Sequence, residues 1–243
     1  MSKIVGLWTA PRSCSNAFLK TFSQRQDTEI IHEPFADIYY FSKWRRSKSM
    51  GEDETRLNTN KQKVINRIKS TIAPLVFFKD FAYEALPYDL PQNFLNCCTN
   101  TFLLRNPKEV IDPWYRVGMY YPTEEELGFV ALERMWTIVT IQLKQKPILV
   151  EANRFRHEPT TILKSYCHQI GIEFEPAMLE WNDSIMKQGH SHSQEFYQKW
   201  RQTLHSSKTI LPPKNIDIKI RPQDMEMIEN AMIIYQKVAS FSL

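Results

Sequence analysis

The chain has 243 residues, of which 42% are hydrophobic, 12% aromatic and 24% charged. This composition is typical of a soluble globular protein, and it excludes a disordered chain, a collagen-like chain and a coiled coil. The net charge of +4 is too small to indicate nucleic-acid binding.

Short β-rich runs alternate with helical patterns along the chain. The β-rich runs predict strands over residues 4–9, 29–32, 75–79, 101–105 and 148–151. Apolar residues at helical spacing predict helices over 17–22 and 159–170. This alternation indicates an α/β fold, in which a central parallel sheet lies between two layers of helices, and we expect one domain over residues 1–243.

The segment from Ser42 to Ser70 interrupts this pattern, since it is longer and more polar than a minimal connection between a strand and a helix. It contains nine basic and three acidic residues, and we expect part of it to be helical. Two interpretations remain open. It is either a solvated helix face or mobile loop, or a lid whose positive field attracts an anionic ligand.

Two helices in the second half of the chain have recognisable starts. Thr123 and Glu126 form a capping box, and the last helix follows Pro222. The first of these helices is expected to bury Leu127, Val130, Ala131, Met135, Ile138 and Val139. The last helix is expected to bury Met225, Ile228, Met232, Tyr235 and Val238. Between them, the alternating residues 216–220 predict a late hairpin or edge strand.

The spacing of the cysteines and glycines limits the kinds of metal and phosphate site that the sequence predicts. The four cysteines form no CxxC pair and no ligand spacing with histidine, so we expect neither a zinc site nor a disulfide framework. None of the six glycines belongs to a GxGxxG or Walker-type loop. The sequence shows no signal-peptide pattern and no apolar run approaching the roughly 20 residues of a membrane span, so we expect a cytoplasmic protein.

The turn after the first predicted strand has the features of an anion site. It reads Pro11-Arg12-Ser13-Cys14-Ser15-Asn16 and then opens a helix. A helix N-terminus offers free N–H groups, to which the turn adds hydroxyl and amide donors and one fixed positive charge. Serine and asparagine are also ordinary helix caps, but ligands bind parallel sheets at the carboxyl ends of strands, which favours a ligand site.

This turn and two later segments resemble the sulfotransferase family. The turn is similar to the phosphosulfate loop of that family, and Arg105-Asn106-Pro107-Lys108-Glu109-Val110 is similar to its strand-four motif. Residues 148–151 and the turn at 171–176 resemble its fifth strand and a later turn, so the likeness covers residues 3 to about 205. His32-Glu33-Pro34-Phe35 and Lys79-Asp80-Phe81-Ala82 are most similar to the short bacterial branch.

The resemblance implies a P-loop-NTPase-like fold and a defined reaction. A sulfuryl group would pass from 3′-phosphoadenosine 5′-phosphosulfate (PAPS) to a hydroxyl, or less readily an amine, of a small molecule. Adenosine 3′,5′-bisphosphate (PAP) would be released, and no metal is required. The reaction would belong to small-molecule or secondary metabolism, without a nucleic-acid or membrane partner, and a homodimer is compatible with the sequence.

The resemblance also implies the residues of the site. The donor nucleotide would be bound by Arg12, Ser13, Cys14, Ser15, Asn16, Ala17, Arg105, Lys187 and Gly189. Within this set, Arg105 would hold the 3′-phosphate and Arg12 would contact the transferring sulfuryl group. The catalytic candidates are Arg12, Glu33, His32 and Lys79.

Glu33 is the preferred general base, because side chains alternate along a strand and only one of His32 and Glu33 should face the cleft. His32 is the alternative base or a structural histidine. Lys79 either orients the bridging oxygen or the acceptor, or is a surface lysine at the strand end.

Three positions depart from the family pattern. Cys14 replaces a glycine, Pro113 replaces a serine, and Phe81 stands where the cytosolic eukaryotic enzymes have a histidine base. A nucleotide-binding module without turnover is therefore one alternative. A small-molecule kinase of related fold is another, although the chain lacks the Gly-Lys-Ser/Thr that holds nucleotide phosphates and Mg²⁺.

Overall fold

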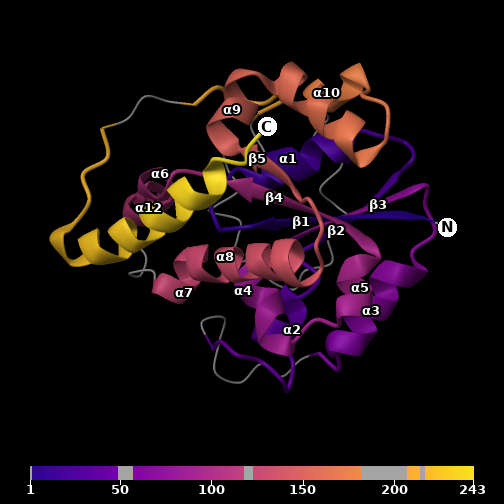
Figure 1. The fold of residues 1–243 in the computed structure, drawn as a ribbon, viewed down its shortest axis with the longest axis horizontal. Coiled ribbons are helices and arrows are strands. Elements are labelled where there is room, and N and C mark those ends of the chain that lie inside the picture. Colours follow the sequence, from indigo (N-terminus) through magenta and orange to yellow (C-terminus); the bar gives the residue numbers. More distant parts are fainter. Residues whose placement is uncertain (1, 49–56, 118–122, 182–206, 214–216) are drawn as a thin grey trace.

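A parallel sheet of five strands forms the centre of the molecule (Figure 1). The computed structural model describes residues 2–48, 57–117, 123–181, 207–213 and 217–243. The strands are β1 (Lys3–Thr9), β2 (Thr28–His32), β3 (Leu75–Phe81), β4 (Cys98–Leu104) and β5 (Ile148–Glu151), in the spatial order β2-β3-β1-β4-β5. All four pairings are parallel, which confirms the predicted sheet. Because β4 ends at Leu104, Arg105 lies just beyond the strand.

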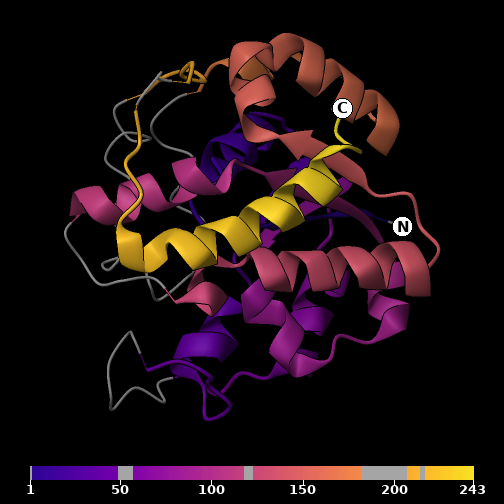
Figure 2. The same ribbon diagram turned by 60° about the vertical axis from the view of Figure 1, so that its left-hand side comes forward.

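Helices cover both faces of the sheet (Figures 1 and 2). One face carries α1 (Ser15–Phe22), α9 (Ala152–His157) and α10 (Pro159–Ile170). The other carries α3 (Lys61–Ser70), α5 (Gln92–Asn96), α8 (Phe129–Thr137) and α12 (Met225–Ala239). Shorter or peripheral helices are α2 (Ala36–Phe41), α4 (Ala82–Ala85), α6 (Pro107–Val117) and α7 (Glu124–Leu127). The structure also has the 3₁₀ helices η1 (Leu86–Tyr88), η3 (Pro176–Leu179) and η5 (Pro222–Asp224), and the π-helix η2 (Ile138–Gln142), which continues from α8.

Each face of the sheet has its own apolar core, as expected for parallel strands buried on both sides. Phe18 and Phe22 of α1 pack with Phe77 of β3 on one face, where the Phe22 and Phe77 rings stack with centroids 4.2 Å apart. On the other face Phe78 packs against Trp8 and Phe94. Packing in these two cores fixes the positions of the strand ends. It therefore also fixes the positions of the residues that follow each strand.

The helix predicted after the capping box is interrupted. The capping box of Thr123 and Glu126 is present, but Gly128, with φ of 80°, ends α7 and precedes α8. Leu127 is buried, whereas Val130 is 49% exposed, so its predicted burial was wrong. Gly128 is also closely packed, because a Cβ at this position would lie 2.9 Å from Cδ of Pro11. The junction therefore packs directly against the turn that follows β1.

The C-terminal helix confirms only part of its predicted buried face. Ile228 and Val238 are buried, but Met225 is 50% exposed. The helix is preceded by the 3₁₀ turn η5, in which Asp224 is buried and accepts a hydrogen bond from Tyr115 at 2.7 Å. This contact sets the start of α12 and leaves Met225 on its outer side. Residues 217–220 form no strand and residue 216 lies outside the described residues, so the predicted late hairpin is wrong for the described part of that stretch.

Replacing Gly6 with alanine should destabilise the sheet. Gly6 lies in β1 opposite Phe78, and an added Cβ would lie 2.5 Å from Cζ of that buried ring. We expect Gly6→Ala to lower the free energy of unfolding by about 1–3 kcal/mol, measured by denaturant titration. Gly6→Ala combined with Phe78→Leu should recover part of the loss, because the smaller side chain makes room. An unchanged unfolding midpoint for Gly6→Ala would contradict this.

Candidate functional site

The turn from Pro11 to Asn16 leaves the N-terminus of α1 open. Arg12 and Cys14 both have left-handed backbone conformations, with φ of 59° and 62°. Cys14 is the N-cap residue, yet its side chain forms no capping hydrogen bond, and the first turn of α1 contains no acidic residue. The first N–H groups of α1 and the positive end of its dipole are therefore available to an anion.

Cys14 stands where the sulfotransferase family has a glycine, and its backbone is in the left-handed conformation that glycine adopts most easily. Glycine adopts this conformation without steric cost, whereas a residue with a Cβ bears a strain of about 1 kcal/mol or more. Cys14 nevertheless has φ of 62° and ψ of 17°. The turn thus keeps a backbone conformation suited to glycine even though the glycine is absent.

Arg105 joins the end of β4 to this turn. Its Nη1 donates to the carbonyl oxygen of Arg12 at 2.9 Å, and its Nε contacts Glu109 Oε2 at 3.0 Å. The other oxygen of Glu109 accepts from Asn153 Nδ2 at 2.7 Å, so a residue that follows β5 supports the same group. The Arg105 side chain therefore lies against the main chain of the turn that carries Arg12. Glu109 and Asn153 were not predicted to take part, although Glu109 is four residues after Arg105, a spacing that brings side chains together at a helix start.

Glu33 and Lys79 form a buried ion pair at the ends of β2 and β3. Lys79 Nζ lies 2.5 Å from Glu33 Oε1, and both side chains are almost fully excluded from solvent. The same ammonium group lies 3.5 Å from the centroid of the Phe81 ring. The interpretation of Lys79 as a surface lysine is therefore wrong, because β3 continues to Phe81 and encloses it.

His32 and Glu33 reach the same place, contrary to the prediction from strand alternation. His32 Nε2 lies 3.5 Å from Glu33 Oε1 and 3.0 Å from Asn16 Oδ1. The reason is the backbone of Glu33, whose φ of 45° ends the extended conformation and turns its side chain to the side that His32 faces. Through Asn16, this group is connected to the start of α1.

Two buried carboxyl groups that the sequence analysis did not single out lie behind this pair. Asp80 accepts hydrogen bonds from the N–H groups of Phe35 at 2.7 Å and Phe81 at 2.8 Å, and so fixes the turn that carries Glu33. Burial raises the pKa of Asp80 to about 7. Burial also raises the pKa of Glu84 well above its usual range, and the charges of Asp80 and Glu33 raise it further. Both residues are acidic and lie in a mainly apolar stretch of the sequence, and this pattern could have indicated that they are buried.

The raised pKa of Glu84 gives stability a pH dependence of known sign. A carboxyl whose pKa is higher in the folded state keeps a proton that the unfolded chain loses, so this group lowers stability as pH rises above about 4.5. Glu84→Gln removes this titration, so the variant does not lose this part of its stability as pH rises. The free energy of unfolding of the variant minus that of the wild type should therefore increase with pH, by up to about 1.4 kcal/mol per pH unit. Urea titrations between about pH 5 and pH 8 measure this. Equal pH profiles for the two proteins would contradict it.

Two predicted donor residues, Lys187 and Gly189, lie outside the described residues. Pro113, which replaces a family serine, lies within α6. Over the described ranges, we find no group of three or more His, Cys, Asp or Glu side chains arranged to hold a metal ion. No helix in the same ranges is long and apolar enough to cross a membrane.

Comparison with solved structures places the fold among sulfotransferases. A sulfotransferase domain from the curacin biosynthetic pathway is 13% identical, covers 98% of both chains and superposes with a TM-score of 0.51. A mouse sulfotransferase complexed with PAP is 10% identical, covers 99% of this chain and 86% of its own, and has a TM-score of 0.52. At these identities the likeness concerns the fold alone.

Sequence comparison identifies the family to which the chain belongs. Two proteins of Arabidopsis thaliana, branched-chain-amino-acid aminotransferase-like proteins 1 and 2, are 23% and 22% identical over 240 and 238 residues. This chain spans about two fifths of their length, 42% and 41%. The sulfotransferase domain model matches residues 2–241, nearly the whole chain. The chain therefore belongs to the sulfotransferase domain family.

Proposed function

We propose that the protein transfers a sulfuryl group from PAPS to a hydroxyl, less readily an amine, of a small molecule and releases PAP. The observation that supports this most is the contact between Arg105 and the Arg12 carbonyl, 2.9 Å long. It joins two family motifs, 93 residues apart in the chain, into one cradle, formed by the Pro11–Asn16 turn and Arg105 beside the open N-terminus of α1. A nucleotide with phosphate groups at both ends requires such a cradle.

The residues at the cradle fit an anionic donor. The Arg105 guanidinium is held in place by Glu109, so its orientation toward a phosphate is set before binding. Arg12, Ser13, Cys14, Ser15, Asn16 and Ala17 would supply backbone and side-chain donors to the transferring group and the leaving phosphate. Fixed donors of this kind stabilise charge that develops during transfer.

The acceptor proton would pass to Glu33. As the acceptor oxygen bonds to sulfur and the sulfur–phosphate oxygen bond breaks, that proton needs a base, and the charge on the leaving phosphate needs cations. Glu33 is held by Lys79 and stands next to His32, which is the alternative base. The Asn16–His32 contact connects this base region with the donor cradle.

Replacing Arg105 tests the donor site. Arg105→Ala removes a charge-assisted contact to the nucleotide, and we expect PAP affinity to fall by about 1.5–3 kcal/mol in titration calorimetry. Lys108→Ala is the matched control, because this exposed lysine lies three residues further on in α6 and should leave affinity nearly unchanged. Equal PAP affinity for Arg105→Ala and the wild type would show that Arg105 does not bind the nucleotide.

A further inference from the structure

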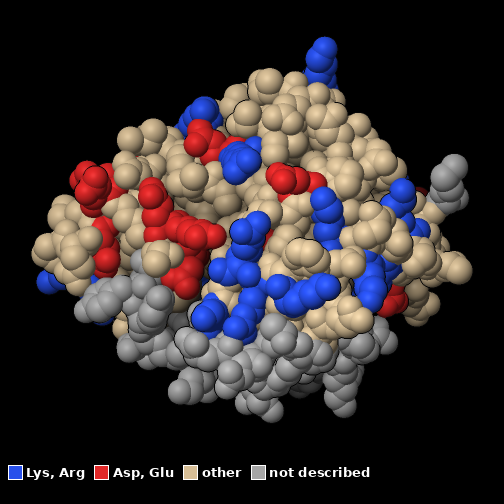
Figure 3. Space-filling view, turned by 90° about the horizontal axis from the view of Figure 1, so that it is seen from below, with Lys and Arg blue, Asp and Glu red and all other residues tan. Residues whose placement is uncertain are grey.

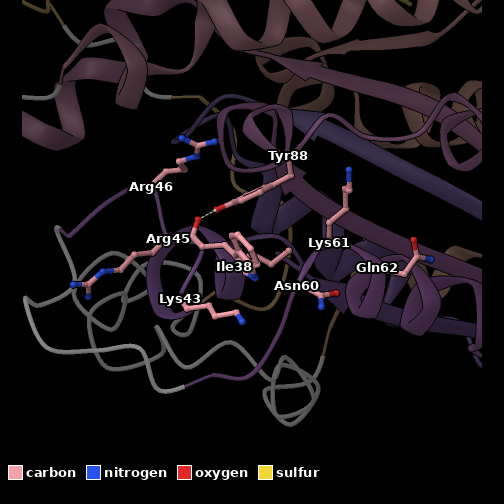
Figure 4. Close-up of a pocket in the computed structure, with 9 residues that line it drawn as sticks. Ile38, Lys43, Arg45, Arg46, Asn60, Lys61, Gln62 and Tyr88 are labelled. Atoms are coloured by element: carbon pink, nitrogen blue, oxygen red, sulfur yellow. Dashed lines mark hydrogen bonds between the residues drawn. The ribbon is translucent and has the colours of Figure 1, made fainter.

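A second cavity lies away from the cradle and the Glu33–Lys79 pair. It has a volume of about 680 Å³ and is lined mainly by residues after α2, at the start of α3 and in η1 (Figure 4). No residue of the Pro11–Asn16 turn lines it, and neither do Arg105, Glu33 or Lys79. A ligand bound here would leave the donor cradle accessible.

The lining of this cavity is strongly cationic. Among the described residues, four lysines and arginines line it and no acidic residue does. Lys61 Nζ contacts only the carbonyl oxygen of Asp89, at 3.2 Å, and within the described residues neither Lys43 nor Arg46 forms an ion pair. Asn60 caps α3 at this point, so the positive end of the helix dipole also faces the region. Figure 3 shows Lys and Arg side chains gathered across the middle of the face seen from below.

Aromatic side chains complete the lining. Trp44 is 55% exposed, although a side chain of this size is usually covered. Its backbone is held in place, since Tyr88 donates to the Trp44 carbonyl oxygen at 3.2 Å, and Lys43 Nζ lies 5.1 Å from the indole centroid. An exposed indole beside Lys43, which forms no ion pair within the described residues, matches a ligand that combines a flat ring with negative charge.

The size of the cavity favours a small molecule over a macromolecule. Small-molecule sites usually have volumes of about 300–1,000 Å³, and the cavity falls within this range. We infer that it binds a small organic anion with a flat ring and at least two negative charges. This inference concerns binding alone and does not depend on the proposed sulfuryl transfer.

Calorimetric titration with 1-naphthyl phosphate tests the inference. The titration is done at low salt with the wild type and with Arg105→Ala, because PAP also combines a flat ring with several negative charges and would compete for this cavity. We expect one-site binding of 1-naphthyl phosphate with equal affinity in the two proteins, and at least about tenfold weaker binding of inorganic phosphate and of 1-naphthol to the wild type. Loss of 1-naphthyl phosphate binding in Arg105→Ala, or equal binding of inorganic phosphate, would overturn the inference.

Two variants locate the bound probe. Lys61→Glu should weaken 1-naphthyl phosphate at least about tenfold, whereas Lys69→Glu, the same charge change at the exposed far end of α3, should have less than about a twofold effect. Trp44→Ala should weaken 1-naphthyl phosphate but not inorganic phosphate. These positions are solvent-accessible, and glutamate is favourable in a first helical turn, so the variants should fold. Equal effects of Lys61→Glu and Lys69→Glu would show that the probe binds elsewhere.

Discussion

Lys79→Met should be strongly destabilising, lowering the free energy of unfolding by about 3–5 kcal/mol. The lysine is fully buried and is paired with Glu33, so its removal takes the ammonium partner away from a carboxylate that stays in the interior. The loss should also be larger at high pH, since the positive charge of Lys79 lowers the pKa of both Asp80 and Glu84. Denaturant titrations at two pH values measure both effects.

The double variant Lys79→Met, Glu33→Gln separates the loss of stability caused by the broken ion pair from the loss caused by altered packing. Replacing both partners of a buried pair is often nearly neutral, so the double variant should be more stable than Lys79→Met alone. Lys69→Met, an exposed change of the same kind, serves as the control. A loss below about 1 kcal/mol for Lys79→Met would mean that the pair behaves like an exposed one.

Glu33→Gln should slow sulfuryl transfer by about 10²–10⁴-fold, the usual contribution of a general base. The amide keeps the size of the side chain but cannot accept the acceptor proton. PAP affinity should stay near that of the wild type, because Glu33 is not part of the donor cradle. Single-turnover transfer to a hydroxyl acceptor and calorimetry with PAP measure the two quantities separately.

Glu29→Gln, at an exposed position of the same strand, is the matched control for Glu33→Gln and should transfer at the wild-type rate. His32→Asn keeps a hydrogen-bonding side chain beside Asn16 and should slow transfer less than Glu33→Gln does. Undiminished transfer by Glu33→Gln together with a large loss in His32→Asn would assign the base role to His32.

The strands could be predicted because each contains a short run rich in β-branched, aromatic or other apolar residues. The resemblance to the sulfotransferase family, and not the strand pattern, implied that Arg12 and Arg105 bind the same nucleotide. It does not predict their hydrogen bond, which depends on the left-handed backbone at Arg12 and on the support of Arg105 by Glu109 and Asn153.

The surroundings of Glu33 show where sequence reasoning failed. Alternation along a strand holds only while the backbone is extended, and the left-handed conformation of Glu33 ends it one residue after β2. The burial of Lys79, Asp80 and Glu84 also escaped prediction, because charged residues usually mark the end of a buried segment. Here they lie inside it, where Asp80 binds two backbone N–H groups and Lys79 pairs with Glu33.

Thermal unfolding of the wild-type chain with PAP, adenosine 2′,5′-bisphosphate and adenosine 5′-monophosphate tests the donor site most directly. A ligand at about 100 times its Kd adds about 2.7 kcal/mol to stability. We predict that PAP raises the unfolding temperature more than either other nucleotide at matched concentration, because in the proposed site Arg105 would contact the 3′-phosphate. No shift with PAP, or equal shifts with all three nucleotides, would contradict a PAPS-dependent site at this cradle.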